Sequence, residues 1–132
     1  MYDRDIIYHV FNQGNNRQTT FFSPENYEYF LRKVKQLIIP HASFFAYCLM
    51  PNRFHFLLKS KDRGMELGRS PKLPSSNTEL HREPRMQLLS QGFRSLLSSY
   101  TQAINRQEGR IGSLWRSKTK IKPGWGADSV LE

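Results

Sequence analysis

The stretch that decides the fold reads YCLMPNRFHFLLKS and runs from Tyr47 to Ser60. Two apolar runs are separated by only Pro51 and Asn52, so the pattern predicts an antiparallel hairpin with strands over residues 43–50 and 53–59. Pro-Asn is not a favoured hairpin turn, which leaves a slightly longer loop as the alternative. In both cases the two strands are neighbours in one sheet.

The second strand of this hairpin carries different chemistry on its two faces, because successive side chains of a strand point in opposite directions. One face, which we expect to pack on the core, carries Phe54, Phe56 and Leu58. The opposite face carries Arg53, His55 and Leu57. Since lone histidines are seldom ligands, the plain interpretation of that face is a half-buried structural histidine beside a solvated arginine. The functional interpretation is a site for an anionic partner.

Two amphipathic helices are predicted elsewhere in the chain. Ser23 as the N-cap and Pro24 at the first helical position indicate a helix that closes near Pro40. Its apolar stripe consists of Tyr27, Phe30, Leu31, Val34, Leu37 and Ile38. A second helix is predicted over about residues 85–107 and is ended by Gly109. Its stripe consists of Leu89, Phe93, Leu96, Leu97, Tyr100 and Ile104.

The order of elements predicts the fold class. Residues 5–16 alternate and are rich in β-branched and aromatic side chains, which indicates a first strand, and the stretch RIGSLWRSKTKIK is a candidate for a last one. Residues 60–84 are expected to form an exposed connector. We therefore predict an α+β, ferredoxin-like antiparallel sheet with helices packed on one face. The domain is expected to cover residues 1–122, followed by a divergent tail over 123–132.

The charge of the chain points to a polyanionic partner. Twenty Lys and Arg stand against 11 Asp and Glu in 132 residues, a net charge of +9, which attracts nucleic acid or an anionic membrane surface. The N-terminal residues suggest neither a signal peptide nor a membrane span, so nucleic acid is favoured and no membrane partner is expected. Cys48 lies in an apolar stretch and is expected to be buried and reduced, which indicates a cytoplasmic protein.

Four stretches resemble a known family. They read YHVFNQGNNRQTTFF, ENYEYFLRKV, AYCLMPNRFHFLL and LLSSYTQAINRQEGRIGSLWRSKTK, and they cover the chain from Tyr8 to about Lys120. In sequence and order they are similar to the tyrosine transposases of small bacterial insertion sequences, the insertion-sequence-200-like or REP-associated group. The hallmark of that family is a strand with the pattern His-hydrophobic-His, which corresponds here to Arg53, Phe54 and His55.

The resemblance implies DNA transposition as the ancestral activity. It implies a ferredoxin-like core, dimeric in most members, that binds DNA hairpins and neighbouring single strand. Two strand histidines would hold a divalent ion, Mg or Mn, that polarises the scissile phosphate. A tyrosine on a later helix would attack and form a phosphotyrosine link, which makes the strand cut and rejoining of mobile DNA a form of recombination.

The first departure from the family lies in the hallmark strand. Arg53 stands where the family has its leading histidine, and a guanidinium has only donors and stays protonated, so it cannot ligate a metal. His55 alone would be a degenerate, weak site for a hard ion that prefers oxygen ligands. We therefore expect a weak or absent metal complex. Arg53 could still hold a phosphate by bidentate hydrogen bonds, which favours binding over cleavage.

The second departure concerns the nucleophile. The family's tyrosine lies on a helix after the segment that matches GSLWRSKTK, and no tyrosine follows Tyr100 here. Tyr100 is the substitute candidate, although its place in the apolar stripe favours a core role. The tail over 123–132 departs from the family, and Leu131 with Glu132 resembles a cloning remnant. A truncated chain, a natural fragment and a decayed copy all stay open.

Basic residues near the end of the chain are candidate DNA contacts. Arg106, Arg110, Arg116, Lys118, Lys120 and Lys122 are accompanied by one acidic residue, Glu108, and by Trp115. Such residues suit phosphates, and an aromatic ring can stack on an unpaired base. A solvated tail in which Trp115 anchors the segment to the core is an equal alternative. A second candidate loop comprises Asn15, Asn16 and Arg17.

Two further groups are weaker candidates. Lys59, Lys61 and Arg63 follow the hallmark strand and either extend the basic patch or form a soluble loop. His9 in the first strand is a structural histidine by default, and alternation alone does not fix its sheet neighbours. The sequence thus predicts a transposase-like protein that binds single-stranded or hairpin DNA and is catalytically impaired. A DNA- or RNA-binding regulatory relic is the alternative.

Overall fold

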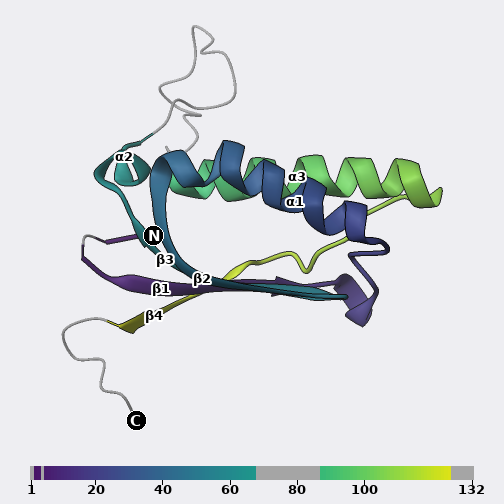
Figure 1. The fold of residues 1–132 in the computed structure, drawn as a ribbon, viewed down its shortest axis with the longest axis horizontal. Helices are drawn as coiled ribbons and strands as arrows, with labels where there is room; N and C mark the ends of the chain where they lie inside the picture. Colours follow the sequence, from purple (N-terminus) through teal and green to yellow (C-terminus); the bar gives the residue numbers. More distant parts are fainter. Residues whose placement is uncertain (1, 4, 68–86, 126–132) are drawn as a thin grey trace, which may run out of the picture.

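A computed structural model describes residues 2–3, 5–67 and 87–125. Figure 1 shows two long helices lying side by side on one face of a sheet, and none of the described helices covers its other face. The elements in chain order are β1 (Ile7–Gln13), the 3-10 turn η1 (Asn15–Arg17), α1 (Pro24–Leu37), the 3-10 turn η2 (Ile39–His41), β2 (Ala42–Met50), β3 (Arg53–Ser60), α2 (Asp62–Met65), α3 (Leu88–Glu108) and β4 (Lys120–Trp125).

The four strands form one antiparallel sheet in the order β2-β3-β1-β4. β1 and β3 are central, and β2 and β4 are the edges. Helices α1 and α3 contact each other, and both pack on the sheet, through Phe30 against Phe54 and Phe93 against Phe56. The predicted α+β class is therefore confirmed, with the strand-helix-strand-strand-helix-strand order of a ferredoxin-like fold.

The hairpin between β2 and β3 uses the short loop. Met50 pairs with Arg53, so only Pro51 and Asn52 connect the strands. The Pro51 carbonyl accepts hydrogen bonds from the backbone N–H groups of Thr20 and Phe21 at 2.8 and 3.0 Å. Contacts with a distant loop thus stabilise a turn that local preference alone does not favour.

The helix-covered face of the sheet contains the core. Phe54, Phe56 and Leu58 are at most 1% exposed, which confirms the face predicted for them. The Phe30 ring of α1 packs on these residues, with its centroid 5.5 Å from that of Phe54. The expectation for Cys48 was wrong, because this side chain is exposed. It lies on edge strand β2 opposite His55, on the face that no helix covers.

Element boundaries differ modestly from those predicted. The helix α3 ends as expected at Gly109, whose φ of +62° is the left-handed conformation that glycine tolerates. Ser60 ends β3 and is buried, and α2 follows, so the start of the predicted connector is folded. The rest of the connector, residues 68–84, lies outside the described part, as do the first two residues of the predicted second helix. The predicted domain end at residue 122 lies within β4. Among the described residues, no helix is long and apolar enough to span a membrane.

Candidate nucleic-acid interface

The uncovered face of the sheet, called here the open face, collects basic and ring-bearing side chains. Strand register places Phe11 opposite His55 on one side and opposite Lys120 on the other, and His9 opposite Lys122. Residues paired in this way point to the same side of a sheet. None of the four described strands contains Asp or Glu. Their four cations are Arg53, Lys59, Lys120 and Lys122.

Three rings form the centre of the open face. The ring centroids of His9 and Phe11 are 4.4 Å apart, those of His9 and His55 are 5.0 Å apart, and those of Phe11 and His55 are 5.4 Å apart. The angles between the ring planes lie between 20° and 28°. His9, Phe11 and His55, called here the three-ring cluster, are half-buried and lie on the two central strands.

The two imidazoles of this cluster are hydrogen-bonded to each other. His9 Nε2 and His55 Nδ1 are 2.8 Å apart, so one of these nitrogens donates and the other accepts. The bond therefore requires that the accepting ring is neutral. Burial lowers the pKa of both histidines, and neighbouring positive groups lower it further: His55 and Lys122 act on His9, and Arg53 acts on His55. Near neutral pH the pair is thus held uncharged.

Cations surround the three-ring cluster. The Lys122 ammonium lies over the Phe11 ring, 5.7 Å from its centroid, and Lys120 pairs with Phe11 across the β1–β4 ladder. The Arg53 guanidinium donates one hydrogen bond to its neighbour, from Nε to Asn52 Oδ1 at 3.3 Å. Lys59 differs because it lies 3.3 Å from an Asp5 carboxylate oxygen. That ion pair leaves Lys59 less suited to an external phosphate than the other three cations.

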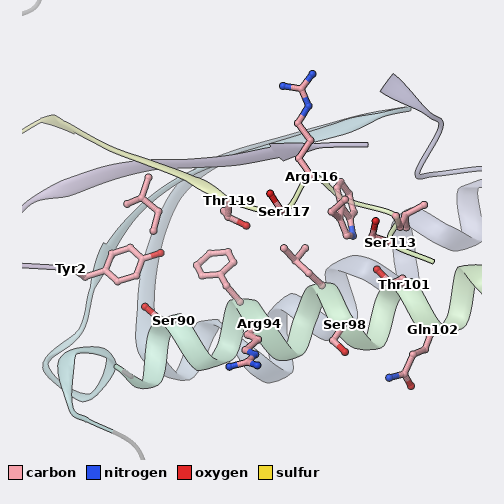
Figure 2. Close-up of a pocket in the computed structure, with 15 residues that line it drawn as sticks. Tyr2, Ser90, Arg94, Ser98, Thr101, Gln102, Ser113, Arg116, Ser117 and Thr119 are labelled. Atoms are coloured by element: carbon pink, nitrogen blue, oxygen red, sulfur yellow. The ribbon is translucent and has the colours of Figure 1, made fainter. Parts of the chain in front are cut away.

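Arg116 adds a further positive charge to the cations around the three-ring cluster. Its backbone N–H donates to the Gln13 carbonyl oxygen at 3.0 Å. With the Gln13 amide oxygen turned towards it, Arg116 also donates from Nη2 at 2.6 Å and from Nε at 3.2 Å. In Figure 2 the Arg116 side chain points away from α3. Because Gln13 pairs with Arg53, the two guanidinium-bearing residues lie at the same end of the sheet.

The structure brings the two predicted contact loops together. The Asn15 backbone N–H donates to the Leu114 carbonyl oxygen at 2.8 Å, and Gly14 bridges to Trp115. Asn16 and Arg17 are exposed, and both have a positive φ of 55° and 59°. Lys118 is exposed in the segment that leads into β4. Asn15, Asn16, Arg17, Arg116 and Lys118 therefore belong to one continuous end of the molecule.

Two predicted contacts lie elsewhere or are occupied. The Arg110 guanidinium donates to the Asn105 side chain, to Gln18 Oε1 at 2.7 Å and to the Ser113 carbonyl oxygen at 3.2 Å. Through these hydrogen bonds Arg110 connects the end of α3 with the loops that contain Gln18 and Ser113. Arg106 is exposed in the last turn of α3, which belongs to the helix layer. Neither residue is part of the open face.

The two aromatic candidates lie in the core. Trp115 is 5% exposed, and its ring centroid is 5.3 Å from that of Phe54, which favours the anchoring alternative over base stacking. Tyr100 is fully buried, and its hydroxyl donates to the Thr20 carbonyl oxygen at 2.7 Å. Burial, and then the neighbouring Tyr27, raise the pKa of Tyr100. These features suit a core residue, and attack on a phosphate would first require exposure of the hydroxyl.

A groove of about 630 Å³ lies between α3 and the segment over residues 113–121. Figure 2 shows that its two arginines, Arg94 and Arg116, point away from the space between these elements. Its apolar lining consists of Phe93, Leu97, Leu114, Trp115 and Ile121. The groove therefore lacks the inward positive charge that a phosphate backbone requires.

The open face does not fit the divalent ion that the resemblance implies. Among the described residues, no group of three or more His, Cys, Asp and Glu could hold a metal ion. The nearby donors of the described strands are His9 and His55, which are hydrogen-bonded to each other, and the Cys48 thiol opposite His55. Nitrogen and sulfur ligands do not suit Mg or Mn, which favour oxygen ligands. The adjacent Arg53 contributes positive charge instead of a ligand.

Sequence reasoning missed the partners of His55. Phe11 and Gln13 were not singled out, and His9 was expected to be structural by default. Their common signal was the alternation of β1, which puts His9, Phe11 and Gln13 on one face. What the sequence could not provide is the pairing of β1 with β3, and this pairing brings Phe11 to His55.

Comparison with known proteins supports the fold. No protein-family model matches the chain, and no curated protein matches it in sequence. Among solved structures, the REP-associated tyrosine transposase bound to a REP hairpin is similar, with a TM-score of 0.56 and 11% identity. The match covers 92% of this chain and 57% of that one, so this chain spans little more than half of that protein's length. The two proteins share a fold.

Proposed function

We propose that this protein binds single-stranded or hairpin DNA through the open face of its sheet and the loop end beside it. The observation that carries the proposal is the charge of that face: four described strands contain four cations and no acidic residue. The structural neighbour is bound to a DNA hairpin, which supports DNA as the partner. The resemblance in the hallmark strand adds a transposase ancestry.

A salt titration tests the proposal. The chain is titrated with a labelled DNA hairpin that carries a single-stranded extension, at several salt concentrations. We expect the logarithm of affinity to fall linearly with the logarithm of salt, by a slope of about 0.7 for each phosphate contact to a single strand. Replacing Lys120→Gln and Lys122→Gln together should lower that slope by about 1.4.

Lys33→Gln with Lys35→Gln on α1 is the matched control, because it removes the same charge from the helix layer. An equal loss of slope in both double variants would count against the open face. Binding that hardly depends on salt would count against phosphate contacts altogether. The same titration with RNA of the same sequence tests the RNA-binding alternative.

We propose further that DNA nicking is impaired in this chain. Arg53 stands at the metal-ligand position of the family, and the buried Tyr100 is the substitute nucleophile. A labelled hairpin incubated with magnesium or manganese is therefore expected to give no covalent adduct. An adduct that disappears in Tyr100→Phe would overturn this proposal. Arg53→His should raise manganese affinity, and no gain would mean that the hallmark strand is not a residual ligand pair.

The resemblance also implies a homodimer, and β2 is our candidate for its interface. This edge strand has nine residues without a charge, and Phe45 and Tyr47 are 55% and 58% exposed. The other edge, β4, carries lysines and a proline, which discourage pairing with another strand. Tyr47→Lys should convert a dimer to a monomer in sedimentation experiments. A wild-type chain that is monomeric at all concentrations would refute the dimer.

A further inference from the structure

The three-ring cluster has no packing role comparable with that of the rings on the covered face. Phe11 is half-buried on the open face, where it lies between His55 on one neighbouring strand and Lys120 on the other. The hydrophobic effect favours burial of such a ring, and here the described chain covers it only in part, through His9, His55 and Lys122. A partly exposed, near-parallel set of rings surrounded by cations suits a planar ligand attached to a polyanion.

We propose that Phe11 is a stacking platform for an unpaired base of single-stranded DNA, with Lys120, Lys122 and Arg53 on the adjacent phosphates. This inference rests on the proposed function and states which form of DNA the open face selects. Every base presents a π-face, so such a platform accepts any base and binds with little sequence preference. His9 and His55, hydrogen-bonded and nearly parallel to Phe11, hold the ring in place.

The positions of the cations suit a single DNA strand that runs along β1 and β4. Lys120 and Lys122 are two residues apart on one strand, so their stems leave the same face about 7 Å apart. The Lys122 ammonium now lies over the Phe11 ring. An incoming base would take its place on the ring, and the flexible lysine would move to a backbone phosphate. The cation–π contact between Lys122 and Phe11 is thus replaced by two contacts, one between the base and Phe11 and one between Lys122 and the phosphate.

Single strands are favoured for a physical reason. In a duplex, each internal base is already stacked on its neighbours and paired, so its π-face is not available to a protein ring. Phosphate contacts by lysines, in contrast, are possible with either form. The platform therefore predicts that the loss of Phe11 affects single-strand binding selectively, whereas the loss of the lysines affects both forms.

The test uses the full chain and three labelled probes: an oligo-dT of about twelve nucleotides, an abasic strand of equal length and a duplex. Phe11→Leu keeps an apolar side chain but removes the ring, and Phe11→Tyr keeps the ring. Phe22→Leu is the matched control, because Phe22 is 43% exposed and lies outside the sheet, before α1. Thermal unfolding of each variant verifies that it is folded.

We expect Phe11→Leu to weaken oligo-dT binding by about tenfold, with an unchanged salt slope. Duplex binding by Phe11→Leu, and all binding by Phe22→Leu, should stay as in the wild type. Phe11→Tyr, which keeps the ring, should lose much less affinity for oligo-dT than Phe11→Leu does. The wild-type chain should bind the abasic strand about tenfold more weakly than oligo-dT, and Phe11→Leu should cause no further loss on that strand. The abasic comparison needs no variant, so equal affinity for the two strands would refute the platform even if Phe11→Leu does not fold, and Phe11→Tyr then assigns the contact to this position.

Failure of the stacking platform and failure of the proposed function give different results. Equal affinity of the wild type for the abasic strand and oligo-dT, with the expected salt slope, would refute the platform and leave DNA binding by phosphate contacts intact. Absence of salt-dependent binding to any of the three probes would refute the proposed function itself. Equal losses on oligo-dT and duplex in Phe11→Leu would also overturn the platform, because they would indicate damage to the whole surface.

Discussion

The two faces of this sheet use the same strands for opposite purposes. On β3, Phe56 points to the helices and is 1% exposed, whereas the neighbouring His55 points to the open face and is half-buried. On β1, Val10 and Phe11 divide in the same way. The covered face contains no charged side chain from any strand, and all four strand cations lie on the open face. The alternation of a strand therefore separates the residues that fold the protein from those that can meet a partner.

Rings have different roles on the two faces. On the covered face they meet at varied angles, such as 78° between Phe30 and Tyr100, as expected for a packed core. On the open face the three rings are within 28° of parallel. Core rings are fixed by neighbours on all sides, while the open rings stack on one another and remain partly exposed. This difference is the reason that we place binding on one face and stability on the other.

The largest effect that tests this comparison is on stability. Phe56→Ala should lower the free energy of unfolding by about 3–5 kcal/mol, because it leaves a cavity among the core rings. Phe11→Ala on the open face should cost only about 1 kcal/mol, since solvent already reaches this side chain. Urea unfolding of both variants measures the difference. Similar losses in the two variants would show that the open face also belongs to the packed core.

A second prediction concerns the buried phenol. Tyr100→Phe keeps the ring but removes the donor to the Thr20 carbonyl oxygen. It should destabilise the protein by about 1–2 kcal/mol, because a buried acceptor is left without its partner. DNA affinity should not change, since Tyr100 lies on the helix side of the sheet. Ser98→Ala, an exposed hydroxyl on the same helix, is the control and should be neutral. A loss of affinity without a loss of stability would contradict the core role.

The sequence predicted those features of the two faces that depend on local alternation, and it did not predict those that depend on which strands pair. Alternation in β3 was sufficient to assign Phe54 and His55 to opposite sides, because it is a local property of a strand. The fate of Cys48 depended on its strand being an edge, and that of Phe11 on the pairing of β1 with β3. Trp115 also remained open, since the Gly14 bridge and the backbone hydrogen bonds of Leu114 and Arg116 to distant residues fix its segment against the core. These are contacts between distant parts of the chain, which composition and periodicity do not specify.

The smallest predicted effect is a pH dependence of the open face, and it has opposite signs for stability and for binding. Because the pKa values of His9 and His55 are lowered in the folded chain, the unfolded chain binds protons first as the pH falls below the ordinary value of about 6.5. The free energy of unfolding is therefore unaffected above that pH and decreases as the pH falls towards the folded-state values.

DNA shifts this balance, because phosphates beside His9 and His55 favour the protonated rings. Affinity for single-stranded DNA should thus increase as the pH is lowered from 7 to 5.5, while stability decreases. The charges that face the pair are those of Lys122 and Arg53. His9→Gln with His55→Gln should flatten both dependences, whereas His41→Gln, whose ring lies in η2, should leave the binding profile unchanged. A binding profile that keeps its slope in the double variant would place the responsible proton outside the open face.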